Sequence, residues 1–212
     1  KMMTFKDLSE LIYSEITLTP EDYETRYPAR DLPAGAKVTR LGPSPTGFIH
    51  LGNLYGAFVD ERLAHQSGGT FYLRIEDTDD KRFVENAVET IITSLEFFDI
   101  RFDEGVTENG DIGEYGDYTQ SHRGEIYRCF AKKLLAEGKA YPCFLTEEEI
   151  SATREKQEAM KIAPGIYAGW SKYRDWDKEE AVASEVEAKI KAGEPFVIRL
   201  KSQGVPNASG DE

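Results

Sequence analysis

The stretch KVTRLGPSPTGFIHLGNLYGAF (residues 37–58) decides the fold, because it reads as a strand, a loop and a helix in direct succession. Residues 37–41 form a short run typical of a strand. The following GPSPTG contains two prolines and two glycines, so it cannot be helical and is predicted to be a rigid loop. A helix is then predicted from His50, because apolar residues at positions i, i+3, i+4 and i+7 share one face: Leu51, Leu54, Tyr55 and Phe58.

A second strand and helix follow at once. Gly68-Gly69 ends the first helix, and TFYLRI (residues 70–75) is rich in β-branched and aromatic side chains, as strands are. The next helix is predicted to turn six apolar residues inward: Val84, Ala87, Val88, Ile91, Ile92 and Leu95. Strand, helix, strand, helix at this spacing is typical of a parallel sheet with right-handed crossovers. The predicted fold class is therefore α/β.

The rest of the chain adds helices and short strands on both sides of this unit. Two helices are predicted before residue 36, and residues 99–119 are predicted to form a long loop rich in glycine and acidic residues. Beyond that loop we expect a helix over 121–137, a strand over 140–144, a helix capped by Thr146, a helix over 177–192 and a strand over 195–201.

Composition narrows the class of protein. The 212 residues are 40% hydrophobic, 11% aromatic and 31% charged, as expected of one or two globular domains. No apolar run approaches the about 20 residues of a membrane span, and no secretory h-region begins the chain, so we expect a cytoplasmic protein. Two cysteines, Cys129 and Cys143, cannot form a disulfide scaffold or a four-thiolate metal site. The net charge of −13 argues against generic nucleic-acid binding.

The strand end, loop and helix start at residues 40–53 are the first candidate site. A helix N-terminus attracts phosphate, and in an open parallel sheet this one would lie at the carboxyl edge, where ligands bind. His50 could donate to a phosphate, and Gly52 would let a flat group lie against the helix. The alternative is an ordinary rigid turn in which His50 is an incidental cap. Spacing alone does not separate the two.

The second candidate site is RIEDTDD (residues 74–80), which follows the adjacent strand. By alternation, Glu76 could hold a substrate ammonium, whereas the spacing of the acids does not match a calcium-binding EF-hand loop. For Asp79 and Asp80 we favour a solvated helix start over a binding role. His65 and His122 are predicted to be structural. A small satellite core is favoured over a base-stacking surface for four aromatic residues: Tyr167, Trp170, Tyr173 and Trp176.

Two of these segments together resemble a known family. Residues 40–53 and 74–79 are similar to the R-F-A-P-S-P-T-G-x-x-H-I-G and R-I-E-D-T-D motifs of glutamyl-tRNA synthetases, which are class I aminoacyl-tRNA synthetases. Supporting matches cover the chain from 37 to 201: Tyr118-x-Gln120-Ser121-x-Arg123, Tyr127, Gly138-x-Ala140-Tyr141, Tyr167-x-Gly169, and Gly193-Glu194-Pro195-x-Val197-Ile198-Arg199. The P-x-E-P-N-G and R-F-D-D-T-N patterns of glutaminyl enzymes do not occur.

The resemblance implies a role for each matching residue. It assigns Arg40, Gly42, Ser44 and Glu76 to binding of L-glutamate, and His50, Leu51, Gly52 and Asn53, the positions of the family's HIGH motif, to binding of ATP with Mg²⁺. It places Asp77, Thr78 and Arg82 near the 3′ end of tRNA(Glu). The implied activity is glutamate–tRNA ligation through glutamyl-adenylate.

The resemblance also implies a division of the chain. It gives a helical N-terminal extension over 1–36, the first half of a Rossmann-like catalytic domain over 37–115, an inserted α/β acceptor-stem-binding subdomain over 116–205, and a tail over 206–212. Among the positions where some relatives carry zinc ligands, only Cys143 is a ligand type, while Leu145, Ser171 and Tyr173 fill the others, so no zinc and no other structural metal is expected.

One departure from the family is large. Nothing in the sequence resembles the KMSKS loop or the second half of the nucleotide-binding sheet. We therefore expect the amino-terminal part of a monomeric enzyme about twice as long, with these 212 residues inactive by themselves. Two alternatives stay open: the short paralogue that attaches glutamate to a modified base of tRNA(Asp), a glutamyl-queuosine tRNA(Asp) synthetase, and a non-catalytic synthetase-like module that binds tRNA or a partner.

Overall fold

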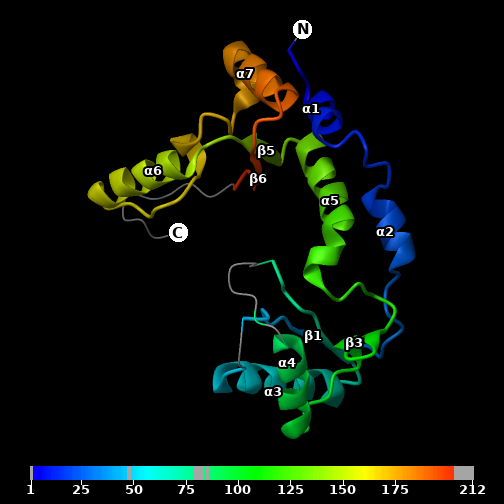
Figure 1. Cartoon of the computed structure of the whole chain (residues 1–212). Helices are drawn as coiled ribbons and strands as arrows, with labels where there is room; N and C mark the ends of the chain where they lie inside the picture. Colours follow the sequence, from blue (N-terminus) through cyan, green and yellow to red (C-terminus); the bar gives the residue numbers. More distant parts are fainter. Residues whose placement is uncertain (1, 47–48, 79–83, 85, 203–212) are drawn as a thin grey trace. The chain divides into compact units, whose positions relative to one another are not determined.

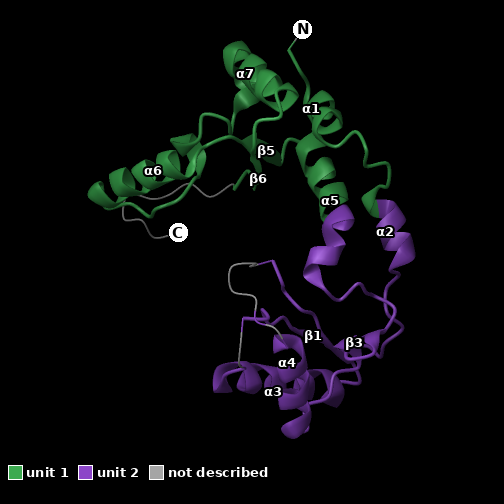
Figure 2. Cartoon of the chain, in the orientation of Figure 1, with its two compact units in different colours: residues 1–20, 127–212 green, residues 21–126 purple. Residues whose placement is uncertain are grey.

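A computed structural model describes residues 2–46, 49–78, 84 and 86–202 of the chain. Packing divides the chain into two compact units, residues 21–126 and residues 1–20 with 127–212 (Figure 2). The α-helices and strands, in chain order, are α1 (Phe5–Ile12), α2 (Pro20–Arg26), β1 (Val38–Leu41), α3 (Leu51–Gln66), β2 (Thr70–Leu73), α4 (Ala87–Phe97), β3 (Glu104–Thr107), β4 (Gly110–Ile112), α5 (Gly124–Ala136), β5 (Ala140–Cys143), α6 (Glu147–Ala159), α7 (Glu180–Lys191) and β6 (Val197–Leu200) (Figure 1).

The unit of residues 21–126 is built on a sheet of order β1-β2-β3-β4. Strands β1, β2 and β3 pair in parallel, and β4 returns antiparallel to β3. Alternate side chains of β2 and of the segment that follows it enter a core shared with α3 and α4: Phe71, Leu73 and Ile75. The succession β1–α3–β2–α4–β3 confirms the predicted α/β class.

The predicted loop over 99–119 is wrong in part, because it contains the hairpin of β3 and β4. Asn109-Gly110 is the local signal for this hairpin, and Gly110 has φ +105°, in the region that favours glycine. Strand β3 is hard to recognise from the sequence because Gly105 stands inside it. Glycine is required there, since a Cβ would lie 2.3 Å from the carbonyl oxygen of Leu73 on β2.

The apolar face predicted for α3 is not the face that the structure buries. Leu51 is 80% exposed and Tyr55 70% exposed, whereas Ala57 and Ala64 are fully buried against the sheet. Small side chains let the helix approach the strands closely, and this closeness decides which face turns inward. Helix α4 follows the prediction within its span, where Ile91 and the other inward residues are buried or partly buried, but Val84, also predicted to turn inward, precedes the helix and is exposed.

The other unit pairs β5 with β6 in an antiparallel ribbon and carries α1, α6, α7 and most of α5. Its core includes Trp176, which is fully buried with its ring edge-on to Phe5 at 5.4 Å, and Tyr173. The satellite core is therefore confirmed for these two aromatic residues of the four. Thr146 caps α6 as predicted, in a reciprocal capping box with Glu149.

The two units are defined by packing alone. Their boundaries fall at residues 20/21 and 126/127, because α1 packs on the Trp176 core whereas the segment after Pro20 belongs with the parallel sheet. The four-part division expected from the resemblance is a division by role and stays a prediction. Among the helices in the described ranges, none is long and apolar enough to cross a membrane.

Candidate functional site

The loops that leave β1 and β2 lie side by side at the carboxyl edge of the sheet. The amide of Arg74 donates to the carbonyl of Leu41 at 3.0 Å, and the amide of Glu76 donates to that of Pro43 at 2.9 Å. The parallel pairing therefore continues past the ends of both strands. This pairing brings together the two candidate segments that the sequence placed at the ends of adjacent strands.

Glu76 holds two arginines at this edge. Its Oε1 accepts hydrogen bonds from Nη1 of Arg40 and from Nη2 of Arg74, the latter at 2.9 Å. The side chains of Arg40 and Glu76 are 37% and 29% exposed, so solvent reaches the pair. Two positive charges and one negative charge thus lie together. Arg40 and Glu76, which the resemblance assigns to the binding of the same substrate, contact each other.

Gly42 is the residue that allows this pair to form. A Cβ at position 42 would lie 2.6 Å from Oε1 of Glu76 and 3.3 Å from Cζ of Arg40. Any larger residue would push the carboxylate away from the guanidinium. The glycine requirement here comes from the close approach of two side chains of the chain itself.

A cavity of about 290 Å³ adjoins the pair. Its lining is formed by Gly42, Pro43, Ser44, Thr46, Ile49, His50, Asn53 and Ile91. Gly42 and Ser44, assigned to glutamate, thus share one cavity with His50 and Asn53, assigned to ATP. Arg40 and Glu76 border Gly42 but do not line this cavity, and Leu51 is exposed.

His50 caps α3 with its own side chain. Its Nδ1 accepts hydrogen bonds from the amides of Gly52 at 3.1 Å and Asn53 at 3.4 Å, and Oδ1 of Asn53 accepts from the amide of His50 at 3.3 Å. These bonds require an unprotonated Nδ1, which assigns the imidazole proton to Nε2. His50 is therefore the N-cap of α3, as in the alternative stated above. Its side chain bonds two backbone amides that were expected to bind phosphate, and its Nε2–H is left as a donor.

Gly52 serves this cap. A Cβ at position 52 would lie 3.0 Å from Cε1 and 3.1 Å from Nδ1 of His50. The glycine therefore makes room for the imidazole of this chain, which is a different reason from the flat ligand expected from the sequence.

Asp77 is bound by Ser121 from the motif that follows the β3–β4 hairpin. The amide and hydroxyl of Ser121 donate to its two carboxylate oxygens at 2.9 and 2.6 Å. Desolvation acts to raise the pKa of Asp77, but the two hydrogen bonds from Ser121 outweigh it, so the pKa lies below its usual value. Thr78 is exposed, and Arg82, like Asp79 and Asp80, lies outside the described residues.

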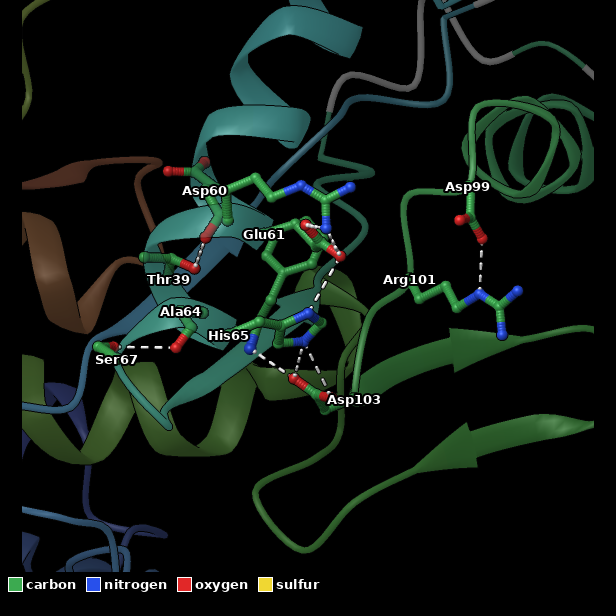
Figure 3. Close-up of polar contacts among 11 residues, drawn as sticks. Thr39, Asp60, Glu61, Ala64, His65, Ser67, Asp99, Arg101 and Asp103 are labelled. Carbon is green, nitrogen blue, oxygen red and sulfur yellow. Dashed lines mark hydrogen bonds and ion pairs between the residues drawn. The ribbon is translucent and has the colours of Figure 1, made fainter.

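His65 lies far along α3 from His50 and is held by two carboxylates (Figure 3). Its Nδ1 is 3.0 Å from Oε1 of Glu61, and its Nε2 is 2.9 Å from Oδ2 of Asp103. Desolvation acts to lower the pKa of His65, but the hydrogen bonds and charges of Asp103 and Glu61 outweigh it and raise the pKa. The role is structural, as predicted, and the same holds for His122, which pairs with Asp117 at 2.9 Å.

The residues at the positions where some relatives carry zinc ligands make packing contacts within the chain. Sγ of Cys143 lies 3.8 Å from Oγ of Ser171, and the ring of Tyr173 packs edge-on against Phe144 at 5.3 Å. Within the part of the chain that the structure describes, no group of three or more histidine, cysteine, aspartate or glutamate side chains could hold a metal ion. The absence of zinc stays a prediction.

Sequence reasoning missed two contacts of this site: the bond from Arg74 to Glu76 and the bonds from Ser121 to Asp77. Alternation along β2 could have indicated the first, since residues 72, 74 and 76 share one face. The second joins residues 44 positions apart and has no local signal.

Comparisons with known proteins show the family to which the chain is similar. The family model of the class I tRNA synthetases (E and Q), catalytic domain, matches residues 37–209. A glutamate–tRNA ligase of Acetivibrio thermocellus is 56% identical over 205 residues, which cover 96% of this chain and 37% of that protein. A glutamate–tRNA ligase of Clostridium perfringens (strain 13) is 53% identical with the same two coverages.

Solved structures give the same result. The glutamate–tRNA synthetase of Elizabethkingia anophelis superposes with a TM-score of 0.65 at 34% identity, over 78% of this chain and 33% of that one. The glutamate tRNA ligase of Elizabethkingia meningosepticum, solved in complex with its amino acid, has a TM-score of 0.63 at 35% identity over 78% of this chain and 32% of that one. The chain therefore spans 37% or less of the length of these relatives, and it belongs to the class I tRNA synthetase family of glutamyl and glutaminyl enzymes, within the catalytic domain.

Proposed function

We propose that the protein carrying this chain is a glutamate–tRNA ligase that acts in the cytoplasm as a monomer. It would activate L-glutamate with ATP and transfer the glutamyl group to the 3′ end of tRNA(Glu). The observation that carries the proposal is the Arg40–Glu76 pair over Gly42, in a chain 56% identical to a glutamate–tRNA ligase. The relatives named above do not favour the short queuosine-modifying paralogue.

The ion pair prepares the site for a zwitterion. A guanidinium binds a carboxylate through two parallel hydrogen bonds, and a carboxylate binds an ammonium. Glutamate would place a carboxylate group against Arg40 and its amino group against Glu76. The ion pair between Arg40 and Glu76 would thus be replaced by two ion pairs with the substrate. Arg74 would keep Glu76 in place during this exchange, because it bonds the same oxygen. Ser44, exposed in the adjoining cavity, and the backbone at Gly42 would complete the contacts to the substrate.

The cavity beside the pair would receive the phosphates of ATP. Nε2–H of His50 is its donor, while Leu51, Gly52 and Asn53 form the first turn of α3. A Mg²⁺ ion bound to ATP would neutralise part of the negative charge of the phosphates. The described residues contain no cluster to hold the metal by themselves, so we propose that it enters on the nucleotide.

The reaction would need positioning rather than a nucleophilic side chain. A carboxylate oxygen of glutamate attacks the α-phosphorus of ATP and pyrophosphate leaves, which gives glutamyl-adenylate. A ribose hydroxyl of the terminal adenosine then attacks the carbonyl carbon, the ester forms, and AMP leaves. Fixed positive charge beside the reacting phosphate and exclusion of water account for most of the rate in such reactions.

We propose the division of the chain by role along the same lines. Residues 37–115 would form the first half of the catalytic domain, 116–205 the acceptor-stem-binding insertion, 1–36 an extension and 206–212 a tail. Asp77, Thr78 and Arg82 would lie near the tRNA 3′ end. The two bonds from Ser121 to Asp77 support this assignment, because they fix the loop after β2 to the segment that opens the insertion.

Exchange of pyrophosphate into ATP by the complete protein tests the proposal, with L-glutamate or L-glutamine and with or without tRNA(Glu). Exchange should depend on glutamate. The variant Arg40→Ala should raise the KM for glutamate about 100-fold, since the binding partner of a charged group is lost. Arg101→Ala is the matched control, because its 81% exposed side chain pairs only with Asp99 among the described residues. Exchange that is indifferent to glutamate would contradict the proposal.

A further inference from the structure

A second pocket, of about 190 Å³, lies in the unit of residues 21–126. Its lining consists of three arginines and four tyrosines: Tyr27, Arg30, Tyr72, Arg74, Tyr115, Tyr118 and Arg123. None of them lines the cavity that contains Ser44 and His50. Because side chains alternate along β2, Tyr72 and Arg74 face away from the core that Phe71 and Leu73 enter. The pocket thus lies on the face of the sheet opposite the core, the face to which Glu76, bonded by Arg74, also belongs.

Protein contacts fix the aromatic walls. The guanidinium of Arg30 lies 3.6 Å from the centre of the Tyr115 ring. The hydroxyl of Tyr27 donates to the carbonyl of Gly116 at 2.8 Å, and the hydroxyl of Tyr118 donates to Glu104 at 2.7 Å. Desolvation and this bond to Glu104 raise the pKa of Tyr118, so its phenol stays neutral. The shape is therefore formed before any ligand binds.

Three hydrogen-bond donors around this pocket are unused. The Nε atoms of Arg30, Arg74 and Arg123 are buried, and no group among the described residues accepts a bond from them. A buried donor without an acceptor destabilises the folded protein. Buried polar groups of proteins are bonded in the great majority of cases, and the three side chains that carry these unused donors all line this pocket.

The charges indicate which kind of acceptor. Arg30 pairs with Glu104, and Arg74 pairs with Glu76. Arg123 instead donates to backbone carbonyls, those of Tyr115 at 3.4 Å and Asp117 at 2.8 Å. Neutral carbonyls do not compensate its charge, so at most two carboxylates, one of them shared with Arg40, match the three arginines of the pocket. An acceptor with a negative charge would balance the third.

We propose that this pocket binds a small oxyanion, a carboxylate or a phosphate. Planar guanidinium groups match both, because the oxygen atoms of either anion accept parallel N–H bonds. The volume lies below the range of pockets for drug-sized ligands, so a compact anion fits and a nucleotide does not. The inference goes beyond the proposed glutamate and ATP sites, and it shares Arg74 with the first of them.

Nuclear magnetic resonance of the arginine Nε–H groups tests the proposal on the unmodified chain. Inorganic phosphate and acetate are titrated separately at constant ionic strength, with sodium chloride as the reference anion. The signals of Arg30, Arg74 and Arg123 should shift and saturate, and the stronger of the two anions identifies the ligand class. The signal of Arg101, which is exposed and paired with Asp99, should not follow them.

The variant Arg123→Lys tests the role of the Nε donor separately from that of the positive charge. Lysine keeps the positive charge but lacks Nε, so anion affinity should fall about tenfold, as for loss of one charge-assisted bond. Arg101→Lys is the matched control and should leave the affinity unchanged. The proposal is overturned if neither anion gives a saturable shift, or if chloride and Arg101 reproduce it. The titration of the unmodified chain decides this even if Arg123→Lys fails to fold.

Discussion

Two charge clusters of three residues lie at opposite ends of the same parallel strands. At the carboxyl end, Glu76 bonds both Arg40 and Arg74. At the amino end, His65 lies between Glu61 and Asp103 (Figure 3). Each cluster therefore places one charged group between two of opposite sign, yet only the first adjoins the candidate site.

The difference between them is what lies beside each carboxylate. Asp103, whose side chain is 44% exposed, accepts a bond from the amide of Phe71 at 2.8 Å in addition to His65, and the side chain of Glu61 is 4% exposed. Glu76 is 29% exposed and lies beside a glycine loop. The same kind of ion pairing thus ties a helix to a strand at one end and stays open to a ligand at the other.

The largest effect we expect comes from Glu76→Gln, which keeps the shape of the side chain and removes its charge. The ammonium of glutamate would lose its partner, so the KM for glutamate should rise about 100-fold while the KM for ATP changes little. Pyrophosphate exchange by the complete protein at varied glutamate and ATP measures both constants.

Glu61→Gln is the control from the other cluster. It should leave the KM for glutamate unchanged and lower the urea midpoint of unfolding, because a buried carboxylate loses its charge beside His65. If Glu61→Gln raised the KM as much as Glu76→Gln, the distinction between the two clusters would be lost.

The sequence predicted the parallel unit because its signals are local. The run of residues 70–75, the Gly68-Gly69 turn and the inward periodicity of α4 each lie within a few positions. Strand β3 and the buried face of α3 could not be predicted in the same way. Both depend on how closely backbone approaches backbone, at Gly105 and at Ala57 and Ala64.

The candidate site was predictable in its position and not in its contacts. Because adjacent parallel strands end at one edge, Arg40 and Glu76 could be placed together from alternation and strand order. Their bond to each other depends on side-chain conformation, as does the capping of α3 by His50. The pocket of arginines and tyrosines joins Arg30 to Glu104 across 74 positions, so no local pattern could indicate it.

A smaller effect, on stability, is expected for Asp103→Asn. The variant loses the charge that holds His65 and weakens the bond to the amide of Phe71, so the free energy of unfolding should fall by about 1–2 kcal/mol. Asp99→Asn is the matched control, since the Asp99–Arg101 pair is 75% and 81% exposed and should contribute about 0.5 kcal/mol or less. Equal urea midpoints for the two variants would show that the amino-end cluster has no special role.

The smallest effect is the pH dependence of the same cluster. The pKa of His65 is raised above its usual value of about 6.5, so the folded chain holds the proton more tightly than the unfolded chain. The stabilisation is therefore fully present below about pH 6.5 and is lost as the pH rises through the higher pKa of the folded state. Because a third of the side chain is exposed, we expect at most about 1 kcal/mol. Urea unfolding of the chain and of His65→Gln between pH 5.5 and 8.5 measures it: the advantage of the unmodified chain should shrink toward the alkaline end, and a constant difference would mean that His65 packs there without its proton contributing.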